Sequence, residues 1–163
     1  MKLIHTALLC EAQPIIEKLR LQKMDKNIYN NDEFILTISG IGEEKTKEAL
    51  NAIFSSHKIK KAINIGIAGC KDKNIPIGKL FCINEEFENI PKASITSVSK
   101  PRKDIKTLLA DMETSAFKTK CEKFHVPYLI FKIVSDHLDA TIPKKAFVSS
   151  LIRESLDKWI KLV

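Results

Sequence analysis

The chain has 163 residues, a formal net charge of +7 and 44% hydrophobic residues. These values predict one globular domain over residues 1–163. The positive charge comes almost entirely from lysines, because only Arg20, Arg102 and Arg153 are arginines. Specific nucleic-acid and phosphate sites favour the planar guanidinium group, whereas dispersed lysines solvate a surface. With an aromatic content of only 7%, a nucleic-acid-binding module is a poor interpretation, and we expect no nucleic-acid partner.

Apolar runs of strand length alternate with helical periods along the chain. In chain order we predict a strand over residues 3–9, a helix over 12–21, a strand over 34–38, a helix over 43–54, strands over 62–67 and 80–83, an edge strand within 93–98, a helix over 112–124, a strand over 128–134 and a helix over 144–162. Such alternation predicts an α/β protein with three α/β/α layers and a mostly parallel or mixed central sheet.

The spacing of cysteine and histidine residues predicts neither a metal site nor a disulfide framework. The four cysteines are widely separated and three lie in apolar stretches, so we expect buried free thiols. The sequence has no apolar run of transmembrane length, and its N-terminus shows no signal-peptide cleavage pattern. We therefore expect a cytoplasmic protein with no metal, no cofactor and no membrane partner.

Polar residues and glycines follow four of the predicted strands. They are Glu11 after the first strand, residues 39–42 after the second, residues 66–69 after the third, and Ser135 with Asp136 after the last. In open α/β sheets, ligands bind outside the carboxyl ends of the strands. The convergence of these residues on one rim of the sheet predicts a binding site there.

Each of these features also fits a purely structural role. Glu11 could simply complement the dipole of the helix that it begins, and glycines after a strand commonly serve a tight turn or close packing. Ser135 and Asp136 could form a turn at the end of a strand. Taken singly, the four features leave both interpretations open.

Residues 110–117 combine a predicted helix start with an acid that has no obvious structural task. We expect Asp111 to cap this helix and Glu113 to lie in its first turn, where N–H groups and the helix dipole stabilise an anion. Met112 taken alone is more typical of a core residue. A ribose diol is a fitting ligand for Glu113.

Six short motifs, taken in order, resemble those of the nucleoside phosphorylase superfamily. The likeness is greatest to its hydrolytic branch, the methylthioadenosine/S-adenosylhomocysteine nucleosidases and futalosine hydrolases. The motifs are residues 7–11, 39–42, 64–69, 77–80, 111–113 and 133–136. The resemblance implies a nucleoside phosphorylase-like fold, a homodimer and a small-molecule nucleoside substrate.

The resemblance also implies roles for individual residues. Glu113 would bind the ribose hydroxyls with Met112 packed against the sugar, Asp136 would protonate or hydrogen-bond purine N7, and Glu11 would orient or deprotonate water. The remaining residues implied to bind substrate are Ser135, Gly66, Ile67 and Ala68. Cleavage of an N-glycosidic bond builds positive charge on the ribose, so an acid, a nearby anion and a placed nucleophile suit this reaction. The expected function is hydrolysis of a purine nucleoside such as methylthioadenosine, S-adenosylhomocysteine or a futalosine-like compound.

Three departures from the family pattern keep alternatives open. Ile67 stands where a hydroxyl residue is common, Lys132 replaces an arginine, and residues 82–110 form a shortened segment. A missing hydroxyl and a trimmed segment favour a non-catalytic nucleoside-binding or scaffold member. A purine nucleoside phosphorylase is disfavoured, because no arginine lies at the aligned glycine-rich positions to hold phosphate. The three retained acids favour an enzyme, since gathered acids would otherwise repel one another.

Overall fold

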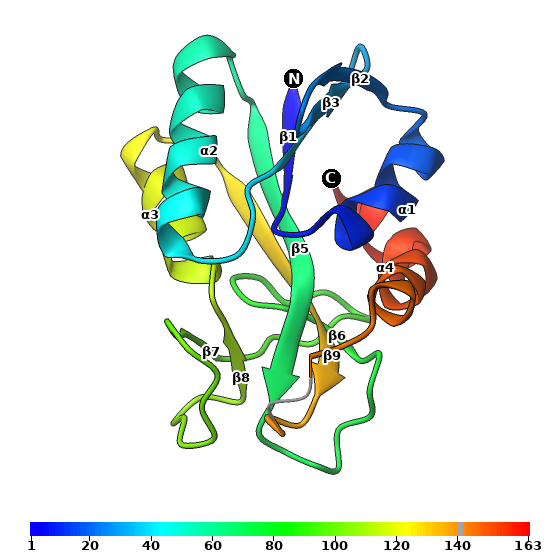
Figure 1. Cartoon of the computed structure of the whole chain (residues 1–163), viewed down its shortest axis with the longest axis vertical. Helices are drawn as coiled ribbons and strands as arrows, with labels where there is room; N and C mark the ends of the chain where they lie inside the picture. Colours follow the sequence, from blue (N-terminus) through cyan, green and yellow to red (C-terminus); the bar gives the residue numbers. More distant parts are fainter. Residues whose placement is uncertain (140–141) are drawn as a thin grey trace.

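The computed structural model describes residues 1–139 and 142–163, which form nine strands and four α-helices (Figure 1). In chain order the elements are β1 (Lys2–Thr6), α1 (Leu9–Leu19), β2 (Gln22–Asp25), β3 (Ile28–Asn30), β4 (Phe34–Ile38), α2 (Glu43–Ser56), β5 (Lys61–Cys70), β6 (Leu80–Cys82), β7 (Ile95–Ser97), β8 (Leu109–Asp111), α3 (Thr114–Lys123), β9 (Tyr128–Asp136) and α4 (Lys145–Trp159), followed by a short 3-10 helix (Ile160–Leu162).

The strands form one mixed sheet with a parallel centre. Its order is β2-β3-β4-β1-β5-β8-β7, while β9 pairs with β5 and β6 pairs with β9. Strand β1 is parallel to β4 and β5, and β9 is parallel to β5. The carboxyl ends of these four strands therefore meet at the same rim of the sheet, which is where such folds bind ligands.

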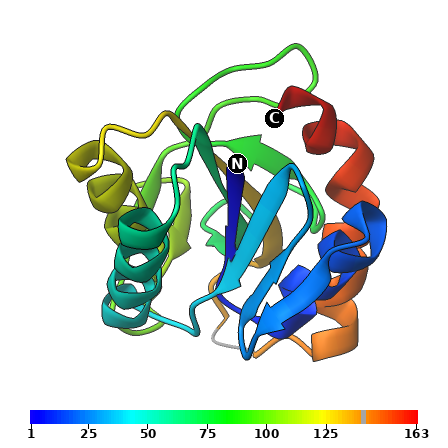
Figure 2. The ribbon, with the colours of Figure 1, turned by 90° about the horizontal axis from the view of Figure 1, so that it is seen from above.

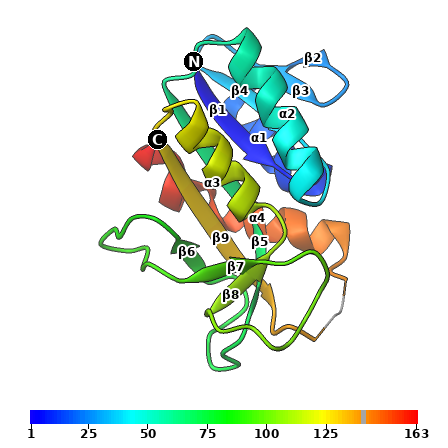
Figure 3. The same ribbon diagram turned by 90° about the vertical axis from the view of Figure 1, so that its left-hand side faces the viewer.

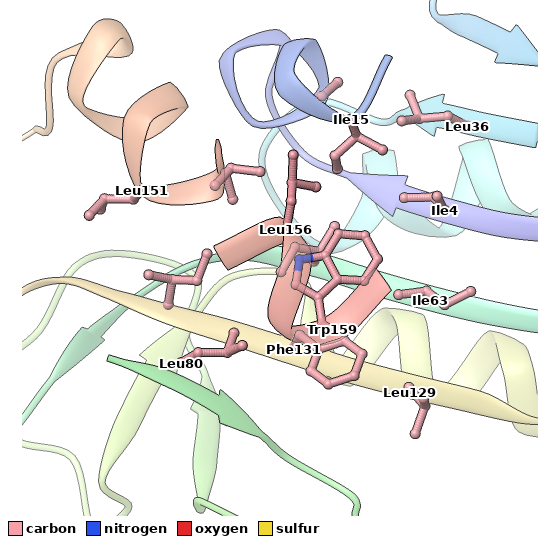
Figure 4. Packing of buried hydrophobic residues seen from close by; sticks show 14 of the residues in the cluster. Ile4, Ile15, Leu36, Ile63, Leu80, Leu129, Phe131, Leu151, Leu156 and Trp159 are labelled. Carbon is pink, nitrogen blue, oxygen red and sulfur yellow. The ribbon is translucent and has the colours of Figure 1, made fainter. Parts of the chain in front are cut away.

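Two pairs of helices cover the sheet, with α1 and α4 on one face and α2 and α3 on the other (Figure 2). Under α1 and α4, the ring of Trp159 packs beside that of Phe131 with centroids 5.8 Å apart, close to Leu156 (Figure 4). Under α2 and α3, Phe117 is fully buried in a second apolar cluster. Burying a large apolar side chain contributes about 1.5 to 3 kcal/mol, so both clusters fix the helices against the sheet.

The predicted three-layer α/β/α architecture is confirmed, and the predicted strand over 34–38 coincides with β4. The predicted edge strand is β7, which lies at the end of the sheet beside β8 (Figure 3). The prediction missed the short strands β2, β3 and β8. All four residues of β2 are exposed, so its sequence carries no apolar alternation that would mark a strand.

The predicted boundary between the first strand and its helix is wrong. The apolar run 3–9 is not one strand, because β1 ends at Thr6 and α1 already begins at Leu9. The Glu11 carboxylate accepts the N–H group of Leu8, the residue that precedes the first helical residue. A glutamate at the third helical position commonly stabilises a helix start in this way.

The predicted helix start at residues 110–117 is also corrected. Asp111 ends strand β8, which pairs with β5 and β7, and helix α3 begins only at Thr114. Asp111 does accept the N–H of Thr114, but it does so from the strand. Glu113 lies just before the first helical residue and not in the first turn.

The four cysteines are free thiols, and Cys70, Cys82 and Cys121 are buried as expected, whereas Cys10 is only partly buried. Among the described residues, no helix has both the length and the apolar character needed to span a membrane.

Candidate active site

A cavity of about 880 Å³ opens at the carboxyl rim of the parallel strands. It is walled by the β1–α1 junction, the end of β5, the β8–α3 junction, the end of β9 and the start of α4. The sequence-predicted residues that line it are Glu11, Ile67, Ala68, Met112, Glu113, Ser135 and Asp136. Its volume lies in the range of sites for small organic ligands, roughly 300 to 1,000 Å³. The fold thus brings together residues that are far apart in the sequence.

The carboxylate of Glu11 is held by three backbone N–H groups. Its Oε2 accepts from Ala7 at 3.0 Å and from Leu8 at 2.9 Å, and its Oε1 accepts from Ile67 at 3.1 Å. Burial raises the pKa of Glu11, although these backbone donors and the charge of Lys132 act against the rise. A carboxylate offers about four acceptor positions, so one remains for a donor from the cavity such as water.

Two glycines of the 64–69 motif make room for acids. A Cβ atom at Gly66 would lie 2.9 Å from Glu11 Oε1, and one at Gly69 would lie 3.0 Å from Asp136 Oδ1 and 2.5 Å from a side-chain carbon of Leu138. Gly66 lies beside Glu11 and is not among the residues that line the cavity. Close packing against Glu11 is therefore the role that the structure gives Gly66, whereas Gly69 both lines the cavity and leaves room for Asp136, so both interpretations stay open for it.

Gly66→Ala is expected to lower the free energy of unfolding by about 1 to 3 kcal/mol, the usual effect of overpacking. The reason is the contact between the new Cβ and Glu11 Oε1. Urea denaturation of Gly66→Ala in the parent and in a Glu11→Asp background checks this. The shorter acid should relieve the contact, so the effect of Gly66→Ala should shrink in that background. An equal effect in both backgrounds would show that Glu11 is not the group displaced.

Asp111, which lines the cavity, forms a buried ion pair with Lys132, which does not. Lys132 Nζ lies 2.8 Å from Asp111 Oδ2, and the two side chains are 2% and 1% exposed. Asp111 also accepts hydrogen bonds from the Thr114 hydroxyl at 2.6 Å and the Ser97 hydroxyl at 2.9 Å. Burial acts to raise the pKa of Asp111, but the Lys132 ammonium and the hydroxyl donors outweigh burial and hold this pKa below its ordinary value.

Glu113 is 8% exposed, and its Oε1 accepts the N–H of Gly42 at 2.8 Å. Gly40 and Gly42 have φ values of 87° and 102°, which residues other than glycine rarely adopt. This turn aims the Gly42 N–H at Glu113 and places Ile41 in the cavity wall. Burial raises the pKa of Glu113, while the positive charge of Lys132 opposes the rise.

Asp136 is the last residue of β9 and is half-buried. Its Oδ2 accepts the Ser135 hydroxyl at 2.7 Å, and its Oδ1 accepts the N–H of Leu138 at 2.9 Å. These two bonds fix the plane of the carboxyl group at the cavity wall. Ser135 therefore orients Asp136, a contact that its place in the sequence alone did not indicate.

The sequence did not predict the apolar walls of the cavity. They come from separate segments and comprise Leu8, Leu9, Ile41, Val98, Leu138, Pro143 and Val148. No spacing in the sequence links these residues, because they meet only when β1, α4 and the 97–102 region fold together. Two exposed cations, Arg102 and Lys145, also line the cavity.

No protein-family model matches the sequence. One curated relative, a 5'-methylthioadenosine/S-adenosylhomocysteine nucleosidase of Buchnera aphidicola, is 24% identical over an alignment that covers 83% of this chain and 78% of that protein. Among solved structures, MTAN from Chlamydia trachomatis bound to adenine has a TM-score of 0.81 at 20% identity, with 99% of each chain covered. Futalosine hydrolase of Helicobacter pylori strain 26695 has a TM-score of 0.79 at 16% identity and covers 99% of this chain and 97% of its own.

The topology and these likenesses define a protein with the nucleoside phosphorylase-like fold. More narrowly, the proteins that it resembles are methylthioadenosine/S-adenosylhomocysteine nucleosidases and futalosine hydrolases, the branch that the six motifs indicated. Both the resemblance and the fold class inferred from the sequence are confirmed.

Proposed function

We propose that the protein is a nucleosidase that hydrolyses the N-glycosidic bond of a purine nucleoside. The observation that carries this proposal is the presence of three acids, Glu11, Glu113 and Asp136, in the wall of one cavity. They come from three separate places at the carboxyl rim of the sheet. Glu11 and Glu113 are both buried, and the charge of Glu113 acts on Glu11. Burying two negative charges near each other is unfavourable, so their presence in this wall favours a chemical task.

The three acids suit the three needs of the reaction. Asp136 would donate a proton or hydrogen bond to N7 as the base leaves, and Glu113 would bind the ribose hydroxyls beside Met112. Glu11 keeps one acceptor position free and would orient the attacking water. An anion near the ribose also stabilises the positive charge that develops on the sugar.

The substrate class is proposed from the cavity walls and the relatives. Leu9 and Ile41 are 54% and 49% exposed and line the cavity, so they offer apolar surface for a substituent at the 5' position of a nucleoside. The relatives are named for methylthioadenosine, S-adenosylhomocysteine and futalosine, and the chlamydial structure holds adenine. These features support a 5'-substituted purine nucleoside as substrate.

A homodimer is proposed from the same rim. The exposed apolar side chains near the cavity include Leu9, Ile41 and Ile142, the last of which is 90% exposed. Large apolar side chains gathered on a surface are typical of contact sites. Sedimentation of the purified protein tests this proposal.

A cytoplasmic location stays a prediction from the sequence.

One experiment tests the reaction. The purified protein is incubated with methylthioadenosine, S-adenosylhomocysteine, futalosine, adenosine and inosine, with and without phosphate, and the released base and sugar are identified. Hydrolysis predicts free base and free sugar at a rate independent of phosphate. No arginine lies at the glycine turns to hold phosphate, and Arg102, which lines the cavity, is exposed and already pairs with Asp104 at 2.6 Å. Ribose 1-phosphate or its 5'-substituted form as the main sugar product would move the protein to the phosphorolytic branch.

A non-catalytic binding protein is the second candidate, and Ile67 is the observation that favours it. Ile67 lines the cavity, and its apolar side chain offers no hydroxyl to a water or substrate. Its backbone N–H already donates to Glu11. Calorimetric binding of a nucleoside without any base release would support this candidate over the nucleosidase.

Glu113→Gln is expected to weaken the cleavage of ribonucleosides at least about tenfold while affecting 2'-deoxy analogues much less. A charge-assisted hydrogen bond is worth roughly 1.5 to 3 kcal/mol, and the 2'-deoxy sugar lacks one of the donors that would make it. The measurement is kcat/KM for each sugar in the parent and in the variant. Equal losses for both sugars would remove Glu113 from ribose binding.

A further inference from the structure

Lys132 is the one lysine or arginine that is buried within residues 1–139 and 142–163. It lies in β9, four residues before Asp136, and its side chain is 2% exposed. Burying an ammonium group is unfavourable by several kcal/mol unless anions compensate it. The groups that surround Lys132 therefore determine whether its buried charge is stable and what it acts on.

The path of the Lys132 side chain depends on Gly66, its cross-strand neighbour in β5. A Cβ atom at Gly66 would lie 3.6 Å from Lys132 Nζ and 2.9 Å from Glu11 Oε1, so both groups approach the same face of this glycine. From there Lys132 reaches β8, where Nζ contacts Asp111 Oδ2 at 2.8 Å. Lys132 thus pairs directly with the acid on β8, and its positive charge acts on the acid on α1 across the space beside Gly66.

Four titratable groups act on Lys132, and each comes from a different part of the fold. They are Asp111 at the end of β8, Glu113 before α3, Glu11 in α1 and His5 in β1. Burial acts to lower the pKa of Lys132, but the carboxylates outweigh burial and keep this pKa above its ordinary value. The lysine is therefore charged at neutral pH.

Lys132 does not line the cavity, whereas Glu11, Asp111 and Glu113 all do. Lys132 can therefore affect a bound ligand only through these three acids. Burial raises the pKa of both Glu11 and Glu113, and in each case the charge of Lys132 opposes the rise.

We propose that Lys132 is a positioning residue for the cavity acids, a fixed positive charge that holds Asp111 in place and lets Glu11 and Glu113 ionise side by side. Its effect on catalysis rests on the proposed nucleosidase function, but its effect on the acids does not. The arrangement makes the lysine a part of the active site that no substrate touches.

The first test is the titration of the Glu11 carboxyl carbon by ¹³C NMR, with the resonance assigned by its loss in Glu11→Gln. Lys132→Met should raise the titration midpoint of Glu11 by about one pH unit or more, since a nearby opposite charge lowers a carboxyl pKa by roughly 1 to 3 units. Lys132→Arg keeps the charge and should leave the midpoint near that of the parent.

A matched pair of variants guards against a loss of folding. Lys132→Met leaves Asp111 buried without its partner, so the same titration is compared between Asp111→Asn and the double variant Asp111→Asn with Lys132→Met. These two proteins differ only in the side chain at position 132, which ends in an ammonium group in the first and is an uncharged thioether in the second. The proposal predicts a higher Glu11 midpoint in the double variant. Equal midpoints in the two proteins would overturn the proposal and leave Lys132 with only a structural role, the ion pair that joins β9 to β8.

Activity provides the second readout. In the double variant, the acidic limb of the kcat/KM profile should move to higher pH by the same number of units as the Glu11 midpoint, relative to Asp111→Asn, and the rate should recover above that limb. A loss of rate that no pH restores would show a structural role instead. If the parent releases no base, the proposed function fails, while the NMR comparison still decides the role of Lys132.

Discussion

Replacing Asp136 with asparagine is expected to reduce base release by about 100-fold to 10,000-fold, the usual contribution of a general acid or base. The amide can still donate a hydrogen bond to purine N7, but it cannot transfer a proton to it. The fold should persist, because the amide oxygen can still accept the Leu138 N–H that Oδ1 accepts at 2.9 Å, and the amide NH2 group can donate to the Ser135 hydroxyl oxygen, which now donates to Oδ2 at 2.7 Å. The measurement is single-turnover release of base from a nucleoside that the parent cleaves.

Ser135→Ala is the matched control for this prediction. It removes the hydroxyl that orients Asp136 but keeps the carboxyl group, so it should reduce the rate by much less than Asp136→Asn. Thermal unfolding of both variants reports whether the fold is intact. A folded Asp136→Asn protein that cleaves nucleosides at the parent rate would exclude Asp136 as the acid.

The stability of the parent is expected to fall on acidification because of His5. The ring is fully buried, accepts from Asn64 Nδ2 at 2.8 Å and lies 2.9 Å from the Ser39 hydroxyl. Burial, helped by the positive charge of Lys132, lowers the pKa of His5 from 6.5 to about 3. The native ring therefore stays neutral in a pH range where the ring of the unfolded chain takes up a proton.

The sign follows from proton linkage. Between pH 6.5 and pH 3 the unfolded state binds the extra proton at His5, so the free energy of unfolding rises with pH in this window. The contribution is fully present above pH 6.5 and is lost as the pH falls towards 3. At about 1.4 kcal/mol per pH unit, the loss of stability amounts to about 2 kcal/mol at pH 5 and approaches roughly 5 kcal/mol near pH 3.

Urea denaturation of the parent and of His5→Gln between pH 8 and pH 4 measures this effect. Glutamine does not titrate in this range, so the stability difference between the two proteins should shrink as the pH falls. Glu11 and Glu113 have raised pKa values and act in the opposite direction, but they are present in both proteins and cancel in the difference. A difference that is constant with pH would show that His5 does not control this acid sensitivity.

The sequence by itself determined the layered α/β architecture and the rim that carries the acids. Strands such as β4 and β9 are mainly apolar, because both of their faces are buried by helices, and this pattern is visible without a structure. The helical periods of α2 and α4 are visible for the same reason, since one stripe of each helix faces the sheet. Because parallel strands end at one rim, the positions of Glu11 and Asp136 followed from the strand predictions.

Only the tertiary structure decided what those acids contact. Asp111 was predicted as a helix cap, yet it ends a three-residue strand whose pairing partners lie in β5 and β7. So short a strand carries no periodicity, and its partners are distant in the sequence. Lys132 appeared in the sequence only as a departure from a family pattern, because its ion pair with Asp111 spans 21 positions and depends on the empty space over Gly66. Ion pairs and cavity walls form between side chains that folding brings together, whereas periodicity reports only which face of an element is buried.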